Sequence, residues 1–122
     1  MNNEEILIDE NTEVEVLTDS LCNAILNSDE YRYYQKCLEE IKKDEELYRR
    51  VNSLRKNNFF AQNGNNGRMS YDEYHNIYNA TRIIRQNDVA DRFLDAELNL
   101  VRMIQKINEK VINTVDFECD FL

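Results

Sequence analysis

The sequence predicts an all-α protein, a small bundle of four or five helices with a long C-terminal helix. Its 122 residues include two glycines and no proline, although turns between β-strands favour both residues. Apolar residues recur every three or four positions, as on one face of a helix. The length suits one domain. We therefore predict an acidic N-terminal arm over 1–11, a single helical domain over 12–115 and an acidic C-terminal tail over 116–122.

The first predicted helix begins at the capping box Thr12-Glu13-Val14-Glu15 and runs to about Asn27. Its apolar face consists of Val14, Leu17, Leu21, Ala24 and Ile25. Ser28-Asp29 caps the next helix, whose buried stripe is Tyr31, Tyr34, Leu38 and Ile41. The stripe slips in phase across Lys42-Lys43-Asp44 and restarts as Leu47, Val51 and Leu54. The slip favours two helices over 29–61, and one kinked helix is the alternative.

Both glycines lie in the predicted loop 62–67. A second capping box, Ser70-Tyr71-Asp72-Glu73, opens a short helix after this loop. The predicted face of that helix is Tyr74, Ile77, Tyr78, Thr81 and Ile84. Asn87-Asp88 starts the last helix, predicted over about 88–115 with a length of about 40 Å.

The last predicted helix carries two apolar stripes. One consists of Phe93, Ala96, Leu100, Ile104, Ile107 and Val111, and the other of Leu94, Leu98, Val101, Ile112 and Val115. Two stripes favour two sets of neighbours, one inside the subunit and one outside it. The alternative is a central helix buried in its own bundle. We expect an oligomer, a dimer in the simplest case. Its predicted interface consists of Phe93, Leu94, Leu98, Leu100, Val101, Ile104, Ile107 and Val111.

The net charge of −9 is unevenly distributed along the chain. Residues 1–20 contain seven acidic residues and no Lys or Arg, whereas residues 21–115 contain 15 basic and 14 acidic residues. Acidic ends disfavour binding to a phosphate backbone, so we expect no direct DNA binding. A membrane span needs about 18 apolar residues in a row, and a signal peptide begins with basic residues. Neither pattern is present, so we expect a cytoplasmic protein without membrane insertion.

A search for catalytic chemistry is negative. His75 is the single histidine, and no Gly-rich phosphate loop or Cys-x-x-Cys pair occurs. We therefore expect no enzymatic activity, no catalytic residue and no metal site. One basic cluster, Arg49, Arg50, Arg55 and Lys56, precedes Phe59-Phe60. Basic residues beside aromatic ones can contact RNA, which makes an RNA-binding helper one alternative function.

The three cysteines, Cys22, Cys37 and Cys119, are odd in number and widely separated, which argues against a disulfide framework. Cys22 and Cys37 are predicted to be buried thiols in the first two helices. Cys119 lies in the acidic tail and is the one candidate cofactor-binding residue. An iron–sulfur cluster needs about four such ligands, so we expect no cofactor. A cluster-carrying redox sensor is the second alternative function.

The layout resembles the YlbF/YmcA family of bacterial helical regulators over about residues 12–117. The residues that carry the resemblance are Leu21 to Ile25, Asn27-Ser28-Asp29-Glu30-Tyr31, Tyr34, Asp44-Glu45-Glu46-Leu47, Val51, Asn87-Asp88-Val89, Ala96-Glu97-Leu98-Asn99, Ile104, Ile107-Asn108, Ile112 and Val115-Asp116-Phe117. They form a pattern of helix starts and apolar positions without a catalytic motif.

The resemblance implies a cytosolic, helical protein that is dimeric or of higher order and lacks enzymatic activity. Members of this family act as adaptors that assemble with one another and with a further partner protein. They influence the endoribonuclease RNase Y and, through it, competence, sporulation and biofilm formation. Some members bind iron–sulfur clusters through cysteines near the C-terminus, where this chain has Cys119 alone. The resemblance thus implies a regulatory adaptor of an RNA-processing complex.

Overall fold

The computed structural model describes residues 12–64, 68–115 and 118, and that part of the chain contains five α-helices and no strand. The helices are α1 (Glu13–Leu26), α2 (Asp29–Lys42), α3 (Glu45–Asn63), α4 (Tyr71–Ile84) and α5 (Asp88–Thr114). The all-α prediction is confirmed, and α2 and α3 are two helices, as the phase slip indicated. The predicted arm 1–11 lies outside the described residues, as does the predicted tail except for Glu118.

Each helix begins after a residue whose side chain accepts a hydrogen bond from the backbone of the first turn. These N-caps are Thr12, Ser28, Asp44, Ser70 and Asn87. The Ser70 hydroxyl accepts from the Glu73 N–H at 3.1 Å, and the Glu73 carboxylate accepts from the Ser70 N–H at 3.3 Å. The caps satisfy backbone donors that a helix start would otherwise leave unpaired. Local sequence therefore determines where each helix begins.

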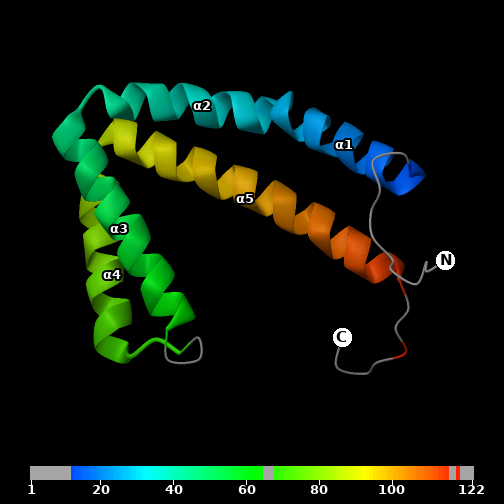
Figure 1. The fold of residues 1–122 in the computed structure, drawn as a ribbon. Helices are drawn as coiled ribbons and strands as arrows, with labels where there is room; N and C mark the ends of the chain where they lie inside the picture. The colour runs from blue at the N-terminus through cyan, green and yellow to red at the C-terminus, as the bar shows by residue number, and fades with distance from the viewer. Residues whose placement is uncertain (1–11, 65–67, 116–117, 119–122) are drawn as a thin grey trace.

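The helices form two arms that meet at a corner (Figure 1). In the long arm, α1 and α2 follow one another, and α5 runs antiparallel beside them. In the short arm, α3 and α4 form a helical hairpin that turns away where α2 joins α3. The most extensive packing between helices joins α2 to α5, and α4 packs mainly on α3.

The hydrophobic core lies at this corner, where α2, α3 and α5 meet. Phe93 of α5 is 0% exposed, and its ring centroid lies 5.6 Å from that of Tyr34 on α2. The guanidinium carbon of Arg55 on α3 lies over the same ring, 5.2 Å from its centroid. The buried residues of this cluster are Cys37, Ile41, Leu47, Val51, Leu54, Ile84, Ala90, Phe93, Leu94 and Ala96.

Away from the corner, the long arm contains no buried residue. None lies in α1, and none lies in α5 beyond Ala96. The long arm there consists of α1 and the end of α5, with no third helix over them (Figure 1). A two-helix layer cannot enclose an apolar face on its own. The apolar residues of this region therefore remain in contact with solvent.

Two sequence-based predictions about burial are wrong. Cys22 is exposed, because α1 contributes nothing to the core. Tyr74 and Tyr78 are 58% and 56% exposed, although they were assigned to the packed face of α4. Ile77 and Ile84, which belong to the same predicted face, do pack on the core, and Ala80 packs there beside them. A helix that packs mainly on one neighbour needs only a narrow apolar stripe.

The core assignment predicts that Phe93→Ala will lower the free energy of unfolding by about 3–5 kcal/mol, because it leaves a cavity where three helices meet. Phe59→Ala is the matched control, since Phe59 is 60% exposed on α3. That exposed site should change stability by no more than about 0.5 kcal/mol. Urea denaturation followed by circular dichroism measures both. Equal losses for the two variants would contradict the placement of the core.

Candidate interaction surfaces

The uncovered part of the long arm presents a set of exposed aliphatic side chains, here called the distal surface. Its members, each 38–62% exposed, are Val14, Val16, Leu17, Leu21, Leu26, Leu98, Val101, Ile104, Val111, Ile112 and Val115. Isolated exposed aliphatic residues are common on soluble proteins, but a gathering on neighbouring helices is typical of a contact site. The distal surface is therefore the first candidate functional site.

The two helices of the distal surface carry opposite charge. α1 contains three acidic residues and no basic one, whereas residues 98–114 of α5 contain three basic residues and one acidic residue. Opposite net charges on the two segments favour pairing between an α1 and the end of an α5. The pairing partner can come from the same chain or from another chain.

The structure divides the eight residues predicted for an oligomer interface into three groups. Phe93 and Leu94 are buried in the subunit core, so they are corrected to core residues, because the corner places them against α2 and α3. Leu100 and Ile107 are half-buried. The exposed members are Leu98, Val101, Ile104 and Val111. The interface itself stays a prediction.

Sequence reasoning recognised an apolar face on α1 but did not assign it to an interface. The signal was present, because Val14, Leu17 and Leu21 are spaced for one helix face. The face was missed because periodicity alone does not tell whether the subunit or a partner covers it.

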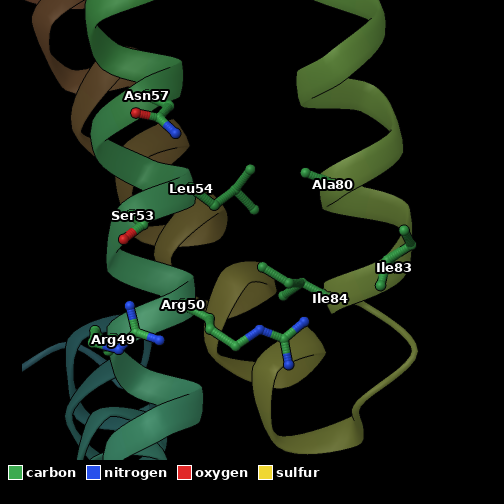
Figure 2. A pocket seen from close by; sticks show the side chains of 8 residues that line it. All are labelled: Arg49, Arg50, Ser53, Leu54, Asn57, Ala80, Ile83 and Ile84. Carbon is green, nitrogen blue, oxygen red and sulfur yellow. The ribbon is translucent and has the colours of Figure 1, made fainter.

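A second candidate site lies between α3 and α4. One hollow of about 350 Å³ is lined by Arg49, Arg50, Ser53, Leu54, Asn57, Ala80, Ile83 and Ile84 (Figure 2). A neighbouring hollow of about 340 Å³ is lined by Asn57, Phe60, Ala61, Glu73, Asn76 and Ile77. The two hollows share Asn57 and follow one another between the helices. From the first hollow to the second, residue numbers rise along α3 and fall along α4. We call them together the α3–α4 groove.

Several carboxylates near the corner are paired with arginine side chains. Arg92 of α5 donates to the Glu40 carboxylate of α2 at 2.8 Å. This hydrogen bond lowers the pKa of Glu40 and raises the pKa of Arg92. Arg85 donates to Asp91 at 2.6 Å and to Asp95 at 2.8 Å. Burial lowers the pKa of Arg85, but its bonds to the two carboxylates outweigh burial and raise it. The Glu40 carboxylate therefore favours its charged form, which suits pairing rather than proton transfer.

The basic cluster predicted from the sequence is divided by the fold. Arg55 turns toward α5, where it pairs with Glu97 and lies over Phe93. Arg49 pairs with Glu46 on the surface of α3. Arg50 makes no ion pair with any residue that the structure describes, and it lines the α3–α4 groove. The cluster is thus not one continuous patch for a phosphate backbone.

The remaining chemical candidates are isolated. His75 is exposed and stacks on Tyr71, with ring centroids 5.5 Å apart. Cys37 is buried, and its hydrogen bond with Tyr33 raises the pKa of that phenol. Cys119, the candidate cofactor-binding residue, lies outside the described residues. Among residues 12–64, 68–115 and 118, no group of three His, Cys, Asp or Glu side chains is placed to hold a metal ion.

None of the described helices is long and apolar enough to cross a membrane. Residues 14–116 match the model of a protein family described as "Control of competence regulator ComK, YlbF/YmcA". Because the match covers most of the chain, the protein belongs to the YlbF/YmcA family, and the resemblance seen in the sequence is confirmed. No curated protein and no solved structure matches the chain. The description of the family is compatible with a regulatory role.

Proposed function

We propose that the protein is a cytosolic regulatory adaptor without enzymatic activity, which binds protein partners and modulates an RNase Y-type RNA-processing complex. The observation that carries the proposal is the distal surface, with eleven exposed aliphatic side chains on α1, α5 and the C-cap of α5. Membership of a family described by its control of a regulator supports the regulatory part. The RNase Y link comes from the family resemblance alone.

The magnitude of the hydrophobic effect supports a protein-binding role for the distal surface. Complete burial of one Val, Leu or Ile side chain contributes about 1.5–3 kcal/mol. The side chains of the distal surface are already partly covered, so each would gain less than this on binding. Several such gains together still offset the entropy cost of association, which is an estimated 4–15 kcal/mol. A partner that covers the whole surface is therefore energetically plausible, whereas a single small ligand is not.

The first partner that we propose is a second copy of the chain. Two copies related by a two-fold axis would place the acidic α1 of each copy against the basic end of the other copy's α5. The contact would be a four-helix bundle built from two α1 helices and two α5 ends. The α3–α4 hairpins lie at the other end of the long arm, so they would remain free for a different protein (Figure 1).

A dimer predicts a mass of about twice 14.6 kDa in sedimentation equilibrium at micromolar concentrations. Ile104→Glu should shift the protein to a monomer without unfolding it, because Ile104 is 43% exposed in the subunit but would meet apolar side chains in the dimer. Gln105→Glu is the matched control at an exposed neighbouring position and should leave the dimer intact. A monomeric wild-type protein across this concentration range would refute the dimer.

The adaptor proposal also predicts an indirect effect on RNA. Deletion of the gene should change RNA processing in cells, whereas the purified protein should neither cut RNA nor bind it tightly. The net charge of −9 gives phosphate groups little long-range attraction. Filter binding with single-stranded RNA at two salt concentrations measures this. Submicromolar, salt-dependent binding that disappears when Arg49, Arg50 and Arg55 are replaced would support an RNA-binding helper instead.

A further inference from the structure

We propose that the α3–α4 groove binds an amphipathic helix of a partner protein, with acidic residues of that helix against Arg49 and Arg50. The inference rests on the adaptor function for the class of partner, and it concerns a site separate from the distal surface. Three features of the groove carry it, namely its shape, its apolar floor and the uneven distribution of its charges.

The shape of the groove suits a helix. Its walls are two antiparallel helices, and its lining runs from Arg49 to Ala61 along α3 and from Ile84 to Glu73 along α4. Twelve helical steps along α3 correspond to about 18 Å, or a little more than three turns of a bound helix. A third helix laid between two antiparallel helices packs its side-chain ridges into the groove that they form.

The floor of the groove is apolar and includes parts of the core. Leu54 and Ile84 are buried residues that lie between the two helices, and Ala80 faces Leu54 across the gap (Figure 2). Ile83 and Phe60 are 51% and 59% exposed and border the hollows. Partly exposed aliphatic and aromatic side chains around a small-residue gap can receive the apolar stripe of a helix, as in other helix-in-groove complexes.

The charges of the groove differ between its two ends. Arg49 and Arg50 lie at the end near the corner, and Arg50 extends from α3 toward α4 beneath Ile84 (Figure 2). The opposite end contains Glu73. Since Arg50 makes no ion pair with the described residues and the Arg49–Glu46 pair is exposed, both guanidinium groups can bind an incoming carboxylate at little cost. The charges therefore favour a partner helix that is acidic at the end next to the corner.

These features favour a protein over a nucleic acid. Single-stranded RNA binds to stacked aromatic side chains along a continuous basic track. The groove lining contains one aromatic residue, Phe60, and its basic residues lie at one end only, opposite the Glu73 carboxylate. The groove also opens away from α5. Arg55, Asn58 and Thr81 line a different hollow together with Leu94 and Leu98 of α5. The distal surface borders that different hollow through Leu98 and Val101, but it contributes no residue to the α3–α4 groove. Both surfaces can therefore be occupied by different partners.

The test uses three synthetic 16-residue peptides, each held helical by a hydrocarbon staple on its outer face and labelled with fluorescein. All three peptides share one leucine stripe. The first has three glutamates near its N-terminus, and the second has three glutamates near its C-terminus. The third has three lysines in place of the glutamates. Fluorescence anisotropy with the full-length protein measures affinity. One of the two acidic peptides should bind at micromolar concentrations and at least tenfold more tightly than the lysine peptide.

Variants of the protein assign the binding to the groove. The double substitution Arg49→Glu and Arg50→Glu should lower the affinity for the acidic peptide at least tenfold. Ile83→Asp should lower the affinity for all three peptides. Arg32→Glu is the control for charge, because Arg32 is an exposed residue on α2. It should leave binding within about threefold. All four positions are exposed, so circular dichroism should show an unchanged helix content.

Three results would overturn the inference. In the first, no peptide binds below 1 mM. In the second, the Arg49 and Arg50 reversals leave binding of the acidic peptide unchanged. In the third, a 20-nucleotide single-stranded RNA binds at submicromolar concentrations and those reversals abolish its binding. Sedimentation of the same variants separates this site from the proposed dimer. The groove variants should keep the mass of the wild-type protein, and Ile104→Glu should bind the acidic peptide as the wild type does.

Discussion

The burial of Phe93 at the meeting point of α2, α3 and α5 is the interaction on which the rest of the structure depends. Its ring contacts Tyr34 of α2 and lies beneath Arg55 of α3, so one side chain joins both arms of the molecule. Beyond Ala96, α5 continues for about five further turns and contributes no buried residue. The placement of the core at one end of a 27-residue helix leaves the other end of that helix, and α1 beside it, without cover.

The uncovered apolar residues, and not a catalytic centre, are the basis of the regulatory role that we propose for the protein. The described residues contain no cluster with the geometry of a metal site, and the ion pairs near the corner hold helices together. The features that favour contact with a partner are two separate surfaces, the distal surface and the α3–α4 groove, which differ in shape and charge. We propose that an identical copy covers the first and that the helix of a different protein binds the second. An adaptor needs two such separate contacts.

Much of the fold was predictable because its determinants are local. The side chains of Ser28, Asp44 and Ser70 cap helices through residues only three positions away, so they could be read from the sequence. Burial was less predictable, as Cys22 and Tyr74 illustrate, since periodicity identifies an apolar face without naming the neighbour that covers it. The α3–α4 groove was not predicted at all. It brings Arg50 and Ile83 together across 33 positions of sequence, and only the packing of the hairpin does so.

The central claim is that a partner chain, rather than the subunit itself, covers the distal surface. Hydrogen–deuterium exchange measured at several protein concentrations tests it most directly. Residues 13–26 and 98–114 should lose protection on dilution or in the Ile104→Glu variant, because their cover is intermolecular. Residues 37–54 and 90–96, which contain most of the core, should stay protected throughout. Protection of the distal helices that matches the core at every concentration and in the variant would contradict the account.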